Sequence, residues 1–118
     1  MAGQKFKVLV ADDSAFARRI TIASLANSEF EVVGEAKSDK EAVAKFKEHT
    51  PDVVLLDVIM PEQGGMYALK EIMQINPQTK VVMLSSLGTE EAITECLMLG
   101  ATTFLQKVYT AQVKDEYI

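Results

Sequence analysis

Apolar residues in this chain occur in two patterns. In some short segments they cluster, and in longer segments they recur at helical spacing. The short runs lie at 6–11, 30–36, 53–56, 80–85 and 102–106, and the one at 53–56 stands between Pro51 and Pro61. Short runs rich in valine and leucine predict strands, and the strands of a parallel sheet are buried on both faces. We therefore expect five strands, with the run at 53–56 buried on both of its faces and ended by Asp57.

The segments between these runs carry apolar residues at helical spacing. Five helices are predicted: Ser14 to Asn27, a second opened by the capping box Ser38 to Glu41, a third from Gly64-Gly65 to Asn76-Pro77, a fourth from Thr89 to Gly100, and a short one at 110–118. The positions expected to face inward are Phe16, Ala17, Ile20, Ala23 and Leu25, then Ala42, Val43 and Phe46, then Met66, Leu69, Ile72 and Met73, then Ala92, Ile93, Cys96 and Leu97. Strands that alternate with helices through short loops imply an α/β fold, a parallel sheet with helices on both faces.

Polar residues stand where four of the five predicted strands end. Asp12 and Asp13 follow the first strand, Asp57 the third and Lys107 the fifth, while Ser85 is the last residue of the fourth. The carboxyl ends of parallel strands meet at one edge of the sheet, where open α/β sheets bind their ligands. These five side chains are therefore expected to gather at that edge.

Length and composition describe one ordinary soluble domain. The chain has 118 residues and 48% hydrophobic content, and no apolar run approaches the roughly 20 residues of a membrane-spanning helix. Residues 1–7 lack the apolar stretch of a secretory signal, and one cysteine, Cys96, cannot form an internal disulfide. We expect a cytoplasmic protein that does not bind membranes. The net charge is −5 and no basic cluster exceeds Arg18-Arg19, so direct nucleic-acid binding is not expected.

Taken together, these residues resemble the receiver domain of bacterial two-component response regulators, most of all the single-domain chemotaxis regulators. The matching features are the pair Asp12-Asp13, Asp57 followed by Met60-Pro61 and Gly65, Ser85 in M-L-S-S, and A-T-T-F-L-Q-K, which ends in Lys107 and places Phe104 three residues before it. The likeness spans about residues 6 to 110. It implies a flavodoxin-like (βα)5 doubly wound parallel sheet with strand order 2-1-3-4-5, and one receiver domain over residues 1–118.

The resemblance implies that Asp57 is the phosphoacceptor and that Mg²⁺ is held by Asp12, Asp13, Asp57 and the backbone carbonyl of Ile59. Adjacent strands lie about 4.8 Å apart, so in the implied order Asp13 and Asp57 bring their carboxylates within a few ångströms. Two such charges about 4.5 Å apart repel by roughly 3 to 4 kcal/mol at an effective dielectric of ~20. The repulsion favours a bound cation, and oxygen ligands suit Mg²⁺.

The resemblance also implies a switch and two protein partners. Ser85 and Lys107 would bind the phosphoryl oxygens, and Phe104 would enter the space that Ser85 leaves when it moves inward. A sensor histidine kinase would supply the phosphoryl group. A downstream target protein would bind the face formed by the helix after Thr89, the strand at 102–106 and the helix at 110–118.

Three features depart from the family pattern. Residue 108 is valine where the family usually has proline after a cis bond, so either a strained cis bond precedes Val108 or a trans bond displaces Lys107. The helix at 110–118 is short for the family, which favours self-association through the C-terminal region. Ile59 and Leu87 are apolar and cannot orient a hydrolytic water, which predicts slow loss of the phosphoryl group.

Two other functions fit part of the pattern. A phosphohydrolase of the haloacid dehalogenase type also sets an acid, a hydroxyl and a lysine above a parallel sheet, but its nucleophile follows the first strand as Asp-x-Asp, where this chain has Asp12-Asp13. The second alternative function is that of a receiver domain that serves only as a protein-interaction module. A flavodoxin is not expected, because A-D-D-S-A-F carries acids where a flavin phosphate needs hydroxyls and glycine. Apart from its own phosphorylation and dephosphorylation, we expect no catalysis.

Overall fold

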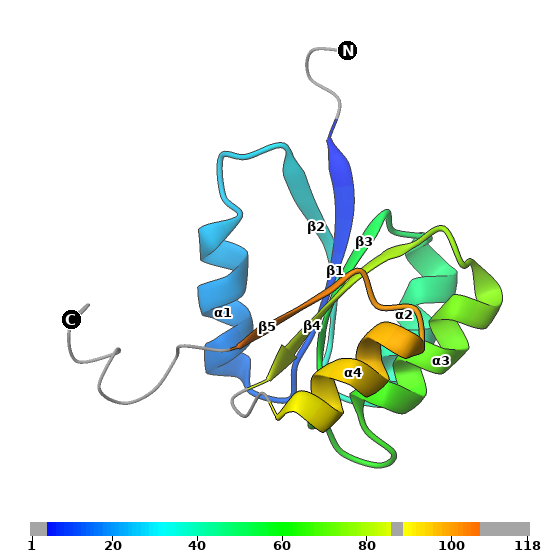
Figure 1. The fold of residues 1–118 in the computed structure, drawn as a ribbon. Helices are drawn as coiled ribbons and strands as arrows, with labels where there is room; N and C mark the ends of the chain where they lie inside the picture. The colour runs from blue at the N-terminus through cyan, green and yellow to red at the C-terminus, as the bar shows by residue number, and fades with distance from the viewer. Residues whose placement is uncertain (1–4, 86–88, 107–118) are drawn as a thin grey trace.

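A single parallel sheet forms the centre of the molecule (Figure 1). The structure is a computed structural model and describes residues 5–85 and 89–106. Its strands are β1 (Phe6–Ala11), β2 (Phe30–Ala36), β3 (Val53–Asp57), β4 (Lys80–Ser85) and β5 (Thr103–Gln106). They run in the order β2-β1-β3-β4-β5, and every neighbouring pair is parallel. The predicted fold class and strand order are confirmed.

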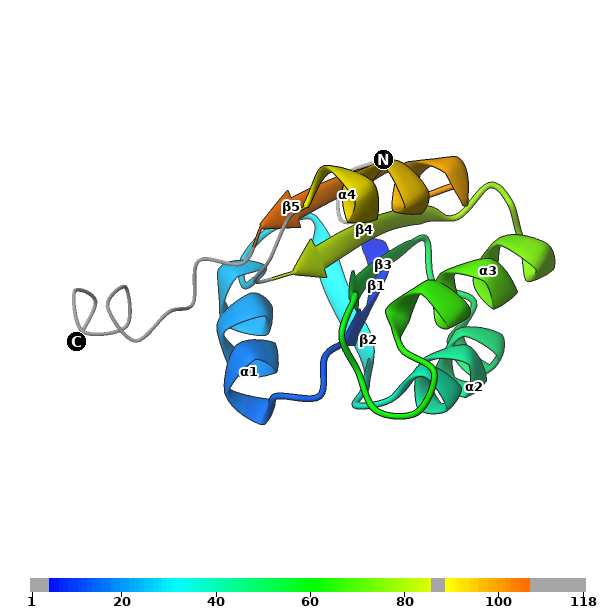
Figure 2. The same cartoon turned by 60° about the horizontal axis from the view of Figure 1, so that its bottom comes forward.

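Helices cover both faces of this sheet (Figures 1 and 2). The described helices are α1 (Ala15–Ser24), α2 (Asp39–His49), α3 (Gly65–Ile75) and α4 (Glu90–Met98). Helix α1 lies on one face, and α2, α3 and α4 lie on the other. None of these four is long and apolar enough to cross a membrane. The helix predicted at 110–118 lies outside the described residues.

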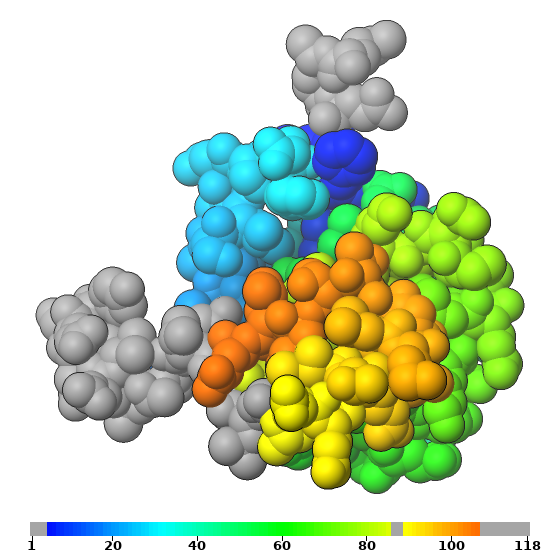
Figure 3. Space-filling model, in the orientation of Figure 1, coloured from blue at the N-terminus to red at the C-terminus, as the bar shows by residue number. Residues whose placement is uncertain are grey.

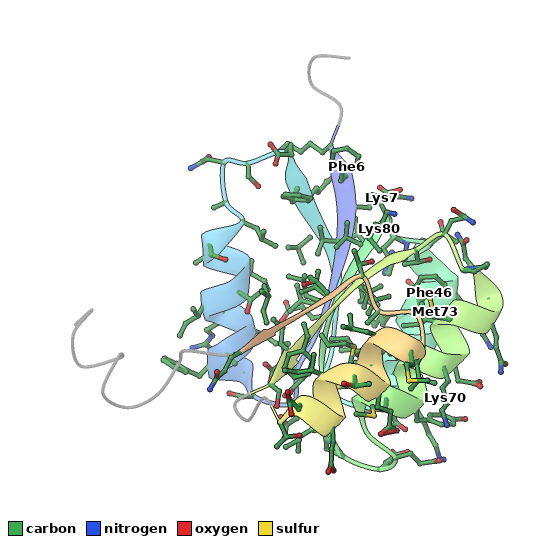
Figure 4. All side chains as sticks on the ribbon, in the orientation of Figure 1. Phe6, Lys7, Phe46, Lys70, Met73 and Lys80 are labelled. Atoms are coloured by element: carbon green, nitrogen blue, oxygen red, sulfur yellow. The ribbon has the colours of Figure 1, made fainter. Side chains whose placement is uncertain are left out.

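The main hydrophobic core lies between the sheet and the three helices α2, α3 and α4. It contains Leu9, Val54, Leu56, Val81 and Met83 from the strands and Ala42, Phe46, Leu69, Ile72 and Cys96 from the helices. Figure 4 shows Phe46 and Met73 on this side of the sheet. The strand residues alternate along the chain because successive side chains of a strand point to opposite faces. The inward positions predicted for α2 and α3 are confirmed.

Side-chain hydroxyls begin three of the four helices. Ser14, Ser38 and Thr89 each accept a hydrogen bond from the backbone N–H three residues ahead, at 3.1 Å in every case. A cap of this kind contributes about 1 kcal/mol to stability. At α2 the Glu41 carboxylate also reaches back to the backbone N–H of Lys37, at 3.1 Å. The predicted capping box is therefore confirmed, and Thr89, where the fourth helix was predicted to begin, is the N-cap of α4.

Helix α1 is shorter than predicted. It ends at Ser24 rather than at Asn27. The backbone N–H groups of Leu25 and Ala26 donate to carbonyls three residues back, which tightens the last turn. Asn27 then adopts a left-handed conformation with φ of 60°. Asparagine tolerates that conformation better than most residues, and it turns the chain toward β2.

Three side chains predicted to face inward are exposed instead. Phe16 is 42% exposed and Ala23 is also exposed, while Thr21, which was not predicted, is buried. Ala17 and Thr21 form the buried stripe of α1, one helical turn apart, and Phe16 lies to the side of that stripe. On α4, Leu97 is 46% exposed, because the residue before it is the one that enters the core.

The two faces of β3 are buried to different degrees, contrary to the prediction. Val54 and Leu56 are fully buried, whereas Val53 and Leu55 are partly exposed. The latter two line an apolar hollow of about 170 Å³ on the α1 side of the sheet. Strand β5 also begins one residue later than predicted, and Thr102 before it accepts with its hydroxyl from the backbone N–H of Val81 at 3.2 Å.

A glycine turn brings the chain back onto the end of β3. The backbone N–H of Gly65 donates to the carbonyl of Val58 at 2.8 Å, which closes the loop at residues 58–64. A Cβ atom at Gly65 would lie 1.9 Å from the backbone oxygen of Asp57. Only glycine permits so close an approach of two backbone segments.

We therefore expect Gly65→Ala to destabilise the protein by about 1 to 3 kcal/mol, because the backbone at Asp57 must shift to admit a methyl group. Urea unfolding followed by circular dichroism measures the change. Gly34→Ala is the matched control, since its Cβ would meet side chains and no backbone, those of His49 at 3.1 Å and Leu9 at 3.4 Å, and it should cost less. Equal stabilities of the two variants would contradict this account.

Candidate functional site

Three carboxylates meet at the carboxyl edge of the sheet, as predicted. Asp12 and Asp13 follow β1, and Asp57 ends β3, the neighbouring strand, whose Leu56 pairs with Ala11. One oxygen from each carboxylate lies within 4.8 Å of the others. Asp12 and Asp57 are 1% and 5% exposed, whereas Asp13 is exposed. Two of the three charges are therefore withdrawn from water.

Backbone N–H groups orient the two buried carboxylates. The N–H of Ser14 donates to Asp12 Oδ1 at 2.9 Å, and the N–H of Ile59 donates to Asp57 Oδ1 at 3.2 Å. Each bond spans two residues and forms where the chain turns away from its strand. Each bond fixes the direction in which its carboxylate faces the edge of the sheet.

Arg18 lies beside this group of acids, and our sequence reasoning did not find its role. Its Nη1 donates to the backbone oxygen of Asp12 at 2.6 Å, and its Nε donates to Glu35 on β2 at 2.9 Å. The side chain is 17% exposed. A guanidinium held by a backbone oxygen and a carboxylate brings a fixed positive charge to the acidic edge. The only signal in the sequence was a basic residue one helical turn after the cap Ser14.

Ser85 lies at the same edge, and Phe104 lies further inside the sheet. Asp57 pairs with Leu84, so Ser85 is one residue beyond it on the neighbouring strand, and its side chain is buried. Phe104 pairs with Met83 and packs, partly buried, against the core beneath α4. Lys107 lies outside the described residues, so its expected position at this edge remains a prediction.

The chemistry of the three carboxylates fits a divalent cation. At separations within 4.8 Å, each pair of charges repels by roughly 3 kcal/mol or more at an effective dielectric of ~20. Carboxylate oxygens are the ligands that Mg²⁺ and other hard cations prefer. The group could therefore hold a metal ion, and the side chain of Ile59, 61% exposed, stands beside it.

Cys96 lies away from this edge and takes no part in it. Its side chain is fully buried in the core. Burial raises the pKa of the thiol, and the negative charge of Glu95 raises it further. A thiol that stays protonated is a poor nucleophile and a poor metal ligand. Cys96 is a packing group of α4.

Comparisons with known proteins agree with this arrangement. The pattern that defines the response regulator receiver domain matches residues 8–116. The chain is 41% identical over 105 residues to the chemotaxis protein CheY of Bacillus subtilis, covering 89% of this chain and 88% of that protein. It is 48% identical to a protein-glutamate methylesterase/protein-glutamine glutaminase of Caldanaerobacter subterraneus, covering 88% of this chain but 29% of that enzyme.

The solved structures show the same fold. The CheY chain in the CheX-CheY-BeF3-Mg complex from Borrelia burgdorferi superposes with a TM-score of 0.87 at 35% identity, over 98% of this chain and 88% of that one. The likeness to the methylesterase lies in the receiver part, so it shows no enzymatic activity of this chain. Strand order, acidic edge and similarity over nearly the whole chain agree: the chain belongs to the response regulator receiver domain family, whose known role is phosphorylation-based signalling.

Proposed function

We propose that this chain is a phosphoacceptor response regulator in which Mg²⁺-dependent phosphorylation of Asp57 switches a protein-interaction face. The observation that carries the proposal is the approach of the Asp12, Asp13 and Asp57 carboxylates to within 4.8 Å of one another. Among these, Asp57 alone ends a central strand of the sheet. The proposal places a sensor histidine kinase upstream and the protein in the cytoplasm, and it limits catalysis to the protein's own phosphorylation and dephosphorylation.

Asp57 is suited to the phosphoryl transfer by its charge and its position. Its ionised carboxylate needs no base, so one oxygen attacks phosphorus in line while the bond from phosphorus to the donor's leaving atom breaks. That atom is the imidazole nitrogen of a kinase phosphohistidine or the carboxyl oxygen of acetyl phosphate. The backbone N–H of Ile59 restrains the rotation of that carboxylate. The three acids and the carbonyl of Ile59 would hold Mg²⁺, which when bound offsets the negative charge of the incoming phosphoryl group.

Ser85 and Phe104 are suited to report the phosphorylation. The Ser85 hydroxyl would donate to a phosphoryl oxygen, with Lys107 pairing with another. Drawing Ser85 inward would open a space on the side of the sheet where Phe104 already packs against the core. An aromatic ring with two packed positions is a two-state element that phosphorylation can bias.

The exposed surface of α4 and β5 is suited to bind the target protein (Figure 3). Met98 and Leu105 are 82% and 53% exposed, so apolar side chains are available on both elements. Helix α4 carries Glu90, Glu91 and Glu95 and no basic residue, which disfavours nucleic acid as the partner. The third element of the predicted face and the self-association region, both at 110–118, lie outside the described residues.

Asp57→Asn removes the nucleophilic oxygen, so we expect it to abolish phosphorylation. In the parent protein, acetyl phosphate with Mg²⁺ should add one phosphoryl group, mapped to Asp57 by mass spectrometry, and chelation of Mg²⁺ should prevent this. Asp52→Asn, at the opposite edge of the sheet, should leave the reaction intact. Continuous phosphate release without a modified protein would indicate a phosphohydrolase, and no reaction at all would indicate an interaction module.

Ile59→Asn should accelerate loss of the phosphoryl group, by up to about 10²-fold, because a polar side chain there can orient the attacking water. The parent protein should lose its phosphoryl group slowly, since Ile59 is apolar and 61% exposed beside Asp57. Decay after removal of acetyl phosphate measures both rates, with Ile59→Val as the apolar control. A half-life of seconds in the parent would contradict the reasoning.

The Ser85→Ala variant should still be phosphorylated, but the conformational change should not reach β5. The reason is that the substitution removes only the hydroxyl that would draw β4 inward. Chemical shifts of β5 backbone amides, recorded with and without beryllofluoride and Mg²⁺, measure the response. We expect large shifts at Phe104 in the parent and small ones in the variant. Shifts of equal size in both proteins would rule out this role for Ser85.

A further inference from the structure

Asp39 is a buried acid away from the three carboxylates, at the first turn of α2. Its side chain is 0% exposed, which is unusual for an aspartate. Its Oδ2 accepts a hydrogen bond from the backbone N–H of Gln63 at 3.1 Å. In the part of the chain that the structure describes, its Oδ1 has no hydrogen-bond partner. A buried carboxylate that is only partly paired opposes folding, so its presence calls for an explanation beyond stability.

The next residue of α2 makes a second contact to the same segment. Lys40 Nζ lies 3.2 Å from Glu62 Oε2, and both side chains are largely exposed. The hydrogen bond and the negative charge of Glu62 raise the pKa of the Lys40 ammonium. Two consecutive residues of α2 therefore hold two consecutive residues, Glu62 and Gln63, of the loop that joins β3 to α3. Figure 2 shows this loop beside the start of α2.

The loop at 58–64 is held in a conformation that its own residues do not favour. Glu62 has a φ of 72°, in the left-handed region, which costs a residue other than glycine about 1 to 2 kcal/mol. The loop begins directly after Asp57 and includes Ile59, whose N–H binds the Asp57 carboxylate. Its far end is closed by the bond from Gly65 to Val58. The contacts from α2 therefore restrain the segment that shapes the phosphorylation site.

We propose that Asp39, assisted by Lys40, is a positioning residue that acts through Gln63 to hold the 58–64 loop in place. The loop in turn keeps the backbone of Ile59 and the carboxylate of Asp57 in the geometry that Mg²⁺ and the phosphoryl group require. The inference rests on the proposed function of Asp57. Groups that orient a metal ligand from behind commonly alter metal affinity or activity by about 10- to 100-fold when they are removed. The burial of Asp39 gives its hydrogen bond the low-dielectric surroundings in which such a contact is strongest.

Two substitutions of similar shape separate positioning from packing. Asp39→Asn keeps an oxygen that can accept from Gln63, whereas Asp39→Leu keeps the volume and removes the acceptor. We expect Asp39→Leu to lower both the Mg²⁺ affinity, measured by calorimetry, and the initial rate of phosphorylation by acetyl phosphate by about 10- to 100-fold. Asp39→Asn should remain close to the parent protein. Urea unfolding gives the folded fraction by which each value is corrected.

Asp52→Leu is the matched control. The Asp52 carboxylate accepts from the backbone N–H of Lys7 at 2.8 Å, so it also ties two distant segments together, but at the opposite edge of the sheet. This variant should lose stability and keep its Mg²⁺ affinity. If folded Asp39→Leu binds Mg²⁺ as tightly as the parent protein, the positioning role is refuted. Failure of the parent protein to be phosphorylated at Asp57 would instead refute the proposed function, and the Mg²⁺ titration would still test Asp39.

The charge pair provides a second test that does not require a buried substitution. Lys40→Glu places two acids together and should lower the phosphorylation rate, and adding Glu62→Lys should restore it by reversing the pair. Both positions are exposed, so the fold should persist in all three proteins. Equal rates in the parent, the single and the double variant would overturn the assistance that we assign to Lys40.

Discussion

The site depends on electrostatic repulsion that a rigid sheet imposes. Strands β1 and β3 are neighbours in one ladder, so the acids that follow them cannot separate without breaking backbone hydrogen bonds. Asp12 and Asp57 are also nearly excluded from water, which strengthens their repulsion. The fold therefore holds a concentration of negative charge that a cation would relieve. In this view the helices and the core mainly hold β1 and β3 in register against the repulsion between these carboxylates.

The loop after β3 shows how the surrounding structure opposes this repulsion. Gly65 allows the start of α3 to rest against the backbone of Asp57, and Asp39 holds the other side of the loop from α2. Arg18 brings a positive charge to the edge from α1. Helices on both faces of the sheet thus contact the segments that carry or follow the three acids. Functional groups keep their geometry when the residues around them are fixed by packing and hydrogen bonds.

The sequence predicted the strands and the acids of the site far better than the residues that support them. The bounds of β1, β2 and β4 agree with the prediction, because short apolar segments that alternate with helical repeats favour strands. The acids were found because strand ends converge at one edge. Arg18 and Asp39 were missed because Glu35, one of the two partners of Arg18, and Gln63, the partner of Asp39, lie 17 and 24 residues away in the chain. An acid in the first turn of a helix is already explained by its favourable interaction with the helix dipole. No neighbouring residue in the sequence indicated that Asp39 would be buried.

The way the helices are anchored suggests which part of the structure can move. Helix α3 is fixed by four buried residues, whereas Cys96 is the only buried residue of α4. Elements with little buried surface shift at low cost, and motions that carry signals are drawn from them. Phe104 packs against the core cluster that contains Cys96 of α4, and its strand pairs with β4 up to Ser85 at the acidic edge. In the switch that we propose, a small displacement of Ser85 would therefore reach α4 through one strand pair and one aromatic ring, whereas the same displacement transmitted to α3 would have to disturb the centre of the core.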